Sequence, residues 1–271
     1  MDRKAVARET LGIMERGYYE FEGKRVDVKV QMEQSISGSL LFSPEQGKKI
    51  LEKYGKSTED PGFSGKTRVE NISAVDAVRR LTEEGRHRIG VLNFASAKNP
   101  GGGFLNGAMA QEESLAASST LYRTLTAHEE YYRANRGQSS MMYTDHAIYS
   151  PDVAFFRDGG FRMVERPVTA SVLTLPAVNM GQVLRKGEDE SLAEQVMYRR
   201  MKLALAIFAR QGAKNLILGA YGCGVFGNDP VKIAAWWKEL LEGGMGQYFD
   251  SVFHAVLDKS RDQRCLKAFL K

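Results

Sequence analysis

The stretch at residues 88–107, RIGVLNFASAKNPGGGFLNG, decides the fold class. Residues 88–95 are largely apolar and predict a buried strand, which leads through a short polar segment to Gly101, Gly102 and Gly103. Consecutive glycines allow positive φ angles and let a backbone approach a ligand closely. They also expose amide hydrogens to oxygen acceptors. Because a bare triple glycine is equally typical of a plain surface turn, its meaning depends on the surrounding chain.

Strands and helices alternate on both sides of this stretch. Such alternation predicts a largely parallel or mixed sheet covered by helices, an α/β fold. In the predicted core, residues 67–271, we expect strands over 68–73, 88–95, 153–156, 161–165, 170–175, 215–218 and 252–257. Helices are expected over 73–84, from 111, over 191–211, over 230–242 and at the C-terminus. The segments over 133–147 and 185–191 are expected to be irregular.

Residues 1–66 are predicted to form an N-terminal extension of the same single domain, 1–271. We expect, in order, a helix over 2–17, a half-buried strand through Val26, Val28 and Val30, a helix over 43–54 opened by the capping-box pattern Ser43-Pro44-Glu45-Gln46, and a loop over 55–66.

Two glutamates follow the triple glycine at a predicted helix start. Seven residues separate Gly103 from Gln111-Glu112-Glu113. Acidic residues in a first helical turn commonly do no more than complement the helix dipole. Neighbours on a helix point about 100° apart, so the two carboxylates would not flank one bond from opposite faces as ordinary glycosidase pairs do. One could instead hold hydroxyl groups while the other transfers a proton. Burial against Phe104, Phe226 or a ligand phosphate would raise the pKa of such a proton donor.

A second glycine-rich loop follows the strand predicted over 215–218. Residues 222–227, GCGVFG, match the GxGxxG pattern of Rossmann dinucleotide sites. The acidic residue after the next strand, Asp258, lies farther on than the roughly 20 residues that the pattern expects, and few residues remain for a Rossmann half. Glycine amides after a strand still suit a diphosphate. Both glycine loops follow strands, and ligands bind outside the carboxyl ends of strands in such sheets.

Three other residues near this loop are interpreted as structural. Cys223 has no histidine nearby in sequence, so we interpret it as a small buried residue and not as a nucleophile. Trp236 and Trp237 lie in a predicted helix and are expected in the core.

Composition limits the function further. The net charge of +5 and the pI near 9.1 suit an anionic ligand. Without a long basic run, we expect no direct nucleic-acid binding. No apolar run approaches the roughly 20 residues of a membrane span, and the N-terminus lacks a signal-peptide pattern. Two cysteines give neither a disulfide framework nor a zinc cluster and fit the reducing cytoplasm.

The glycine triplet and QEE, taken together, resemble the signature of the poly(ADP-ribose) glycohydrolases. The segment LGAYGCGVFGNDP resembles the diphosphate–ribose loop of the compact bacterial-type members, and the resemblance extends over nearly the whole chain through VLNFASAKNPGGGF, IYSPDVAFFRDG and LPAVNMG. The animal enzymes carry an acidic residue and an asparagine in the strand before the glycines. Here the corresponding LNFASAKN contains Asn93 and Ser96.

The resemblance implies a macrodomain core with an N-terminal helical extension, and ADP-ribose lying across the sheet edge. It implies no cofactor and no metal. By motif position, Glu113 is the catalytic acid and Glu112 holds the ribose hydroxyls. The expected substrate-binding residues are Gly101, Gly102, Gly103, Asn106 and Gln111 at the first loop and Gly222, Gly224, Val225 and Phe226 at the second.

The implied activity is hydrolysis of ribose–ribose bonds in poly(ADP-ribose) chains on modified proteins by a monomeric enzyme. Cleavage is expected mainly from the chain end, because Phe226 and the second loop would crowd the outer ribose. Two alternatives stay open from the sequence. One is a hydrolase of single ADP-ribose groups on protein or nucleic acid. The other is a non-catalytic ADP-ribose-binding macrodomain, against which the intact QEE argues.

Overall fold

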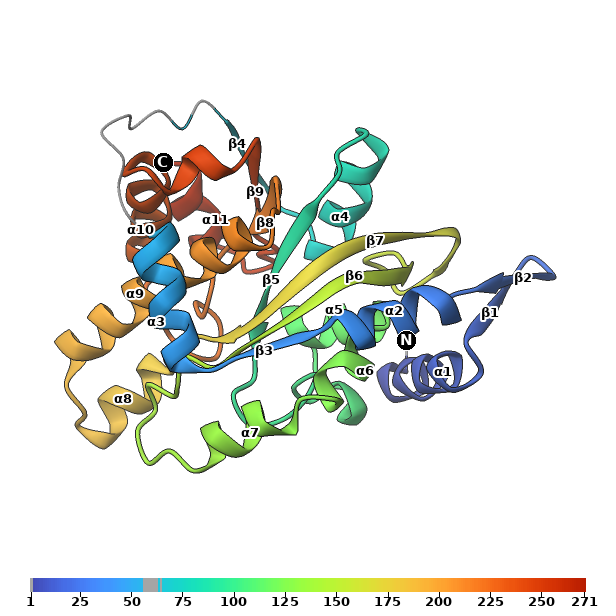
Figure 1. Ribbon diagram of the computed structural model, residues 1–271, viewed down its shortest axis with the longest axis horizontal. Helices are drawn as coiled ribbons and strands as arrows, with labels where there is room; N and C mark the ends of the chain where they lie inside the picture. The colour runs from blue at the N-terminus through green and yellow to red at the C-terminus, as the bar shows by residue number, and fades with distance from the viewer. Residues whose placement is uncertain (1, 56–62, 64) are drawn as a thin grey trace.

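One mixed sheet of seven strands forms the centre of the protein (Figure 1). The computed structural model describes residues 2–55, 63 and 65–271, so most of the loop expected over 55–66 lies outside the described residues. Five neighbouring strands are parallel, and two antiparallel strands extend one edge, which confirms the predicted α/β class. The order is β3 (Leu40–Phe42), β6 (Ala147–Arg157), β7 (Met163–Pro176), β5 (Ile89–Ala95), β8 (Asn215–Leu218), β9 (Ser251–Ala255) and β4 (Lys66–Glu70).

Helices cover both faces of this sheet because its strands alternate apolar side chains between two cores. Leu92 and Leu173 point to one face, whereas Val91 and Val172 point to the other. The first face packs against α3 (Pro44–Tyr54), α8 (Met180–Lys186), α9 (Glu190–Arg210) and α10 (Pro230–Glu242), and α11 (Arg264–Phe269) lies beside α10; the second packs against α4 (Ala74–Glu83), α5 (Gln111–Ser118), α6 (Leu121–Thr126) and α7 (Glu129–Arg136).

The N-terminal extension begins with the expected helix and then departs from the prediction. Helix α1 (Arg3–Arg16) starts at the capping residue Asp2 and ends at Gly17, whose φ is +80°. A hairpin of β1 (Tyr18–Phe21) and β2 (Lys24–Asp27) follows, and then α2 (Lys29–Gly38).

The strand expected through Val26, Val28 and Val30 is therefore wrong beyond Asp27. The Asp27 carboxylate accepts the Lys29 amide and turns the chain into α2, with Val28 buried at the helix start. Val30 lies within the helix and is 57% exposed.

The region after α5 also differs from the prediction. The three short strands expected over 153–175 are two long ones, β6 and β7, which form an antiparallel hairpin with register shifts. The segment expected to be irregular over 133–147 begins inside α7, and β6 starts at its last residue. The charged loop expected over 185–191 is shorter, since α8 ends at Lys186 and Asp189 caps α9. In β6 the polar stretch Ser150-Pro151-Asp152 interrupts the apolar run, and in β7 exposed polar residues lie at 165–166 and 169, so the length of both strands is hidden in the sequence.

The remaining elements are confirmed to within a few residues. Strands β5 and β8 and helices α5, α9 and α10 lie where the sequence places them, as do the C-terminal helix and the cap at Ser73. Strands β4 and β9 each end before the expected boundary, at Glu70 and Ala255.

A small apolar cluster fastens the N-terminal helix to the first glycine loop. Ala7 of α1 packs with Phe104, Ala116 and Ala117. The buried hydroxyl of Thr10 donates to the Ala117 carbonyl at 2.7 Å. Helix α1 is thereby held against η1 (Phe104–Asn106) and α5, as Figure 1 shows near the N-terminus.

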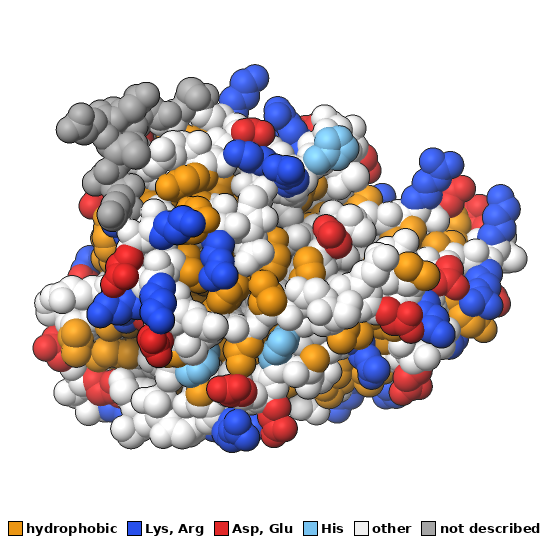
Figure 2. Space-filling model, in the orientation of Figure 1, with side chains coloured by type: hydrophobic (Ala, Val, Ile, Leu, Met, Phe, Trp, Pro, Cys, Tyr) orange, Lys and Arg blue, Asp and Glu red, His pale blue; other side chains and the backbone are white. Residues whose placement is uncertain are grey.

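The surface carries charges of both signs. On the face seen in Figure 2, basic and acidic side chains are interspersed, including those of the projecting β1–β2 hairpin. Within the described residues, no helix is long and apolar enough to cross a membrane.

The capping box at the start of α3 gives a stability prediction. The Ser43 hydroxyl accepts the Gln46 amide, and the Gln46 side chain accepts the Ser43 amide. Ser43→Ala should lower the free energy of unfolding by about 1 kcal/mol, within a range of about 0.5–2. Ser43→Asp keeps an acceptor and should change it little. Urea unfolding with an unchanged m value measures both. Equal losses in the two variants would contradict a capping role.

Candidate active site

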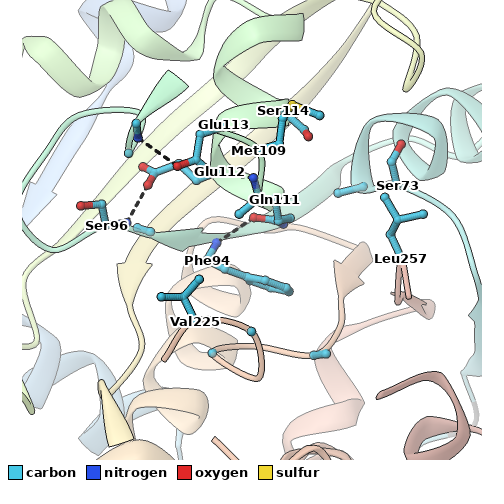
Figure 3. A pocket seen from close by; sticks show the side chains of 18 of the residues that line it. Ser73, Phe94, Ser96, Met109, Gln111, Glu112, Glu113, Ser114, Val225 and Leu257 are labelled. Atoms are coloured by element: carbon cyan, nitrogen blue, oxygen red, sulfur yellow. Dashed lines mark hydrogen bonds between the residues drawn. The ribbon is translucent and has the colours of Figure 1, made fainter. Parts of the chain in front are cut away.

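A large hollow lies at the carboxyl ends of the five parallel strands. It is a cavity of about 960 Å³, lined by the segments that follow β4, β5, β7, β8 and β9. That volume reaches the upper end of the range for small-molecule sites, about 300–1,000 Å³. The cavity therefore lies where open α/β sheets bind ligands, and it is large enough for an extended nucleotide-like molecule (Figure 3).

The cavity opens because β5 and β8 separate. Their pairing ends at Val91 and Ile217, although β5 continues to Ala95 beside β7. Beyond the residues that pair with β8, the side-chain amide of Gln111 forms the hydrogen bonds with β5 that a neighbouring strand would form. Its Nε2 donates to the Leu92 carbonyl at 2.8 Å, and its Oε1 accepts the Phe94 amide at 2.9 Å (Figure 3). Gln111 thus lines the cavity with its amide already bonded to β5, and it fixes the first residue of α5 against that strand.

Glu112 is buried behind this edge. Its carboxylate is 2.6 Å from the Ser96 amide through Oε2 and 3.3 Å from the Asn93 side-chain nitrogen through Oε1, and the residue is only 3% exposed. Asn93 also donates to the Thr174 hydroxyl at 3.1 Å, which ties the carboxylate to β7. In this chain Asn93 and Ser96 therefore serve to hold Glu112.

Glu113 is less buried and is held by the first glycine loop. Its Oε1 accepts the Gly103 amide at 2.9 Å, and its Oε2 accepts the Ala110 amide at 2.9 Å. Gly102 lies beside both glutamates with φ of +61°, and a Cβ there would be only 3.0 Å from Glu113 Cδ and 3.1 Å from Glu112 Oε2. Only glycine tolerates that backbone and that approach together. The triple-glycine loop therefore leaves the space in which the two glutamate side chains fit.

The two neighbouring carboxyls have unequal environments. Burial raises the pKa of Glu112 to about 8, and repulsion from Glu113 adds to the rise, while the hydrogen bonds from Ser96 and Asn93 oppose it. Glu112 is therefore mostly protonated at neutral pH and can donate a hydrogen bond as well as accept one. Neighbouring carboxyl groups whose environments differ in this way are typical of acid–base sites.

The second glycine loop, residues 222–227, faces the glutamates across the cavity. In the described part of the chain, the backbone amides of Gly222, Gly224, Val225 and Phe226 donate to no protein acceptor. Gly222 has φ of +74°, and a Cβ there would be 2.7 Å from Ala177 Cβ. Asn228 holds the turn from behind by donating to the carbonyls of Val178 and Gly222. A turn with several free amides is a binding site for anionic oxygens.

Aromatic and apolar residues shape the second loop. The Phe226 ring is half-buried, 6.1 Å from the Tyr143 ring, and lines the cavity. Val225 is 91% exposed at the tip of the loop, as Figure 3 shows. Burial raises the pKa of the Cys223 thiol, which disfavours a thiolate nucleophile. Cys223 is only partly buried and lines the cavity, so the prediction of a buried residue is wrong. Trp237 lies in the core and donates to the Gly219 carbonyl at 3.1 Å, whereas Trp236 is partly buried against the same core.

Asp258, the acidic residue that a Rossmann site would place on a ribose, lines the cavity but has its carboxylate bonded to backbone amides. Its carboxylate accepts the amides of Ser260 and Cys265 and so caps the segment leading into α11. Among the residues that the structure describes, no group of three or more His, Cys, Asp or Glu side chains could hold a metal ion.

The structure brings the predicted site residues together around one cavity, apart from Gly101. Gly101 is buried behind the lining, packed against Phe104 and Ala116. The segments after β4, β7 and β9 and the start of α1 also line the cavity, and they were not predicted from the sequence. The segments after β4, β7 and β9 could have been predicted, because each follows a parallel strand. Predicted residues on the lining are Gly102, Gly103, Asn106, Gln111, Glu112, Glu113, Gly222, Gly224, Val225 and Phe226, and additional lining residues include Arg3, Ile72, Ser73, Ala177, Leu257 and Lys259.

This combination defines an α/β enzyme of macrodomain-like fold, with a glutamate pair facing a loop of free backbone amides. Residues 7–158 match the family model of the microbial-type PARG catalytic domain. The structure is similar to poly(ADP-ribose) glycohydrolase from Thermomonospora curvata bound to the inhibitor ADP-HPD, with a TM-score of 0.92, 38% identity, and coverage of 99% of this chain and 98% of that one.

The structure is also similar to poly(ADP-ribose) glycohydrolase from Deinococcus radiodurans in complex with ADP-ribose, with a TM-score of 0.82, 38% identity, and coverage of 93% of this chain and 97% of that one. No match to a curated protein was found. The chain belongs to the microbial-type poly(ADP-ribose) glycohydrolase family.

The raised pKa of Glu112 predicts how stability depends on pH. Between about pH 4.5 and pH 8, the unfolded state has lost the proton that the folded state still binds. Wild-type stability should therefore fall across this window relative to Glu112→Gln, by at most about 1.4 kcal/mol per pH unit. Denaturant unfolding of both proteins from pH 4.5 to 8.5 measures the difference. Parallel curves, or a difference that grows in favour of wild type as pH rises, would contradict a proton on Glu112.

Proposed function

We propose that the protein hydrolyses the ribose–ribose O-glycosidic bonds of poly(ADP-ribose) and releases ADP-ribose. The observation that carries the proposal is the glutamate pair, rigidly held by backbone amides and facing a loop of free amides across one cavity. The first arrangement suits acid–base chemistry and the second suits a diphosphate. Family membership supports the same substrate.

The binding mode follows from the two sides of the cavity. The free amides of the second glycine loop receive the diphosphate of the terminal ADP-ribose unit. The ribose beyond that diphosphate then reaches Gly102, Gly103 and Asn106, beside the glutamates. The relatives solved with ADP-ribose or ADP-HPD support a ligand of this size and charge.

The two glutamates take different roles because they differ in access to the cavity and because burial raises the pKa of Glu112. Glu112 is enclosed, and both its oxygens are committed to the end of β5. A protonated carboxyl at that position can hydrogen-bond the ribose hydroxyls next to the bond to be cleaved. Glu113 is more accessible and reaches both the glycine loop and the cavity. We assign proton transfer to Glu113.

The reaction then proceeds in two halves. Glu113 donates its proton to the 2′-oxygen of the departing ribose while the bond between that oxygen and the anomeric carbon breaks. The developing oxocarbenium charge is stabilised by the nearby diphosphate. The Glu113 carboxylate next removes a proton from a water molecule, whose oxygen attacks the anomeric carbon.

Substitution of each glutamate by glutamine separates the two roles. Glu113→Gln keeps the side-chain size but has no proton to transfer, so turnover of polymer should fall by at least about 10²–10⁴-fold. Its affinity for ADP-ribose should change little. Glu112→Gln should weaken both binding and turnover. Polymer hydrolysis, calorimetric affinity for ADP-ribose and thermal stability are measured side by side.

A matched control is Glu45→Gln, which changes a first-turn glutamate of α3 far from the cavity. It should leave activity unchanged. If Glu113 merely capped α5, its glutamine variant would lose about 0.5–2 kcal/mol of stability and keep activity. Parallel assays with polymer and with protein carrying single ADP-ribose groups identify the substrate. Release from the second substrate alone would replace polymer cleavage with mono-ADP-ribosyl hydrolysis.

The position of Phe226 supports cleavage mainly from the chain end. Its ring narrows the cavity beside the free amides that would hold the terminal diphosphate. An additional unit attached to the outer ribose would have to pass this ring. Phe226→Ala should therefore increase the share of internal cleavage and release longer fragments early in the reaction.

Product lengths are followed over time on polymer of defined size, with Phe226→Tyr as the control that keeps the ring. The tyrosine variant should give the wild-type products. Identical early products and rates for wild type and Phe226→Ala, at equal stability, would show that the ring does not restrict the chain.

A further inference from the structure

The N-terminal helix places a cation at the end of the cavity where the departing part of the substrate must lie. Arg3, the first residue of α1, is exposed and lines the cavity. A narrow crevice next to the cavity shares Arg3, Met109 and Glu113 with it. The residues that line this crevice include none of the second glycine loop.

This position of Arg3 is fixed by packing. The Thr10 hydrogen bond and the Ala7–Phe104 contact hold α1 against the first glycine loop. Closer to Arg3, Gly107 lies so near the helix start that a Cβ there would be 3.5 Å from Arg3 Cβ. Among the described residues, no carboxylate forms an ion pair with Arg3, whereas Arg8 one turn later pairs with Asp2. Its guanidinium is consequently available to an anion from outside the protein.

Apolar side chains accompany this cation. Leu105 is 43% exposed and Met109 is 40% exposed, and both line the same end of the cavity. Figure 3 draws Met109 on the side of the cavity that carries Glu113. Exposed apolar side chains beside a free guanidinium match a ligand that has a flat base and a phosphate. The terminal ADP-ribose unit does not occupy this end, because its diphosphate is assigned to the opposite loop.

We propose that Arg3, Leu105 and Met109 form a subsite for the ADP-ribose unit that departs, with Arg3 contacting its diphosphate and the two apolar side chains contacting its adenosine. The identity of the ligand rests on the proposed function. The N-terminal extension thereby takes part in recognising a chain of at least two units, and free ADP-ribose does not reach it.

The test compares di-ADP-ribose with ADP-ribose. In the Glu113→Gln background, which prevents turnover, Arg3→Gln should weaken binding of di-ADP-ribose by about 2- to 5-fold, as expected for one exposed charge contact. It should leave the affinity for ADP-ribose unchanged, and the difference should shrink as salt is raised. Arg8→Gln is the matched control, because Arg8 is an exposed arginine of the same helix outside the cavity, and it should change neither affinity.

The possible results separate the subsite from the activity. Unchanged affinity of Arg3→Gln for di-ADP-ribose, or an equal loss for both ligands, would overturn the subsite. Hydrolysis of di-ADP-ribose by the wild-type protein tests the proposed function independently. An inactive wild type that still shows the selective loss on Arg3→Gln would reject the hydrolase and keep the two-unit binding site.

Discussion

The hydrogen bonds from backbone amides to Glu112 and Glu113 are the interaction on which the rest of the site depends. Ser96 at the end of β5 holds one carboxyl, and Gly103 and Ala110 hold the other. Amides fixed in a loop pay no reorganisation during a reaction, so they keep the carboxyls in place while charge moves. They also require a glycine at position 102, because any Cβ there would collide with both glutamates.

The architecture of the sheet supplies the space for this arrangement. Strand β8 ends at Leu218 and pairs with only the first three residues of β5, and Gln111 satisfies the edge of β5 that β8 leaves uncovered. The same side chain anchors the first turn of α5, from which the glutamates project. The gap in the sheet, the placement of the glutamates and the cavity thus all result from the end of the pairing between β5 and β8. The loop after β8 faces this gap with its amides free.

Much of this organisation could be predicted from local sequence patterns. The strand leading to the triple glycine, the helix start at Gln111 and the loop at 222–227 all depend on neighbouring residues, and they lie where expected. The raised pKa of Glu112 could not be predicted, because it results from burial among β5, β7 and the glycine loop, which are distant in sequence. The contribution of Arg3 was also missed, since an exposed arginine at a helix start carries no pattern of its own.

Turns that depend on a single side chain limited the prediction elsewhere. The Asp27 carboxylate ends a strand that three alternating valines would continue. Polar residues on β6 and β7 made one long hairpin resemble several short strands. Gln111 is predicted to contact substrate, and its second role, which is to satisfy the backbone of β5 with its side-chain amide, could not be predicted. Such roles become visible only when the partner strand is known.

A crystal structure of the Glu113→Gln protein with di-ADP-ribose tests the assigned roles of the two glutamates and the second glycine loop together. The bridging 2′-oxygen should lie about 2.6–3.2 Å from the side chain of residue 113, with Glu112 on the adjacent ribose hydroxyls and the diphosphate of the terminal unit on the amides of the loop at residues 222–227. A bridging oxygen beside Glu112 and out of reach of residue 113, or a diphosphate bound away from that loop, would contradict these roles.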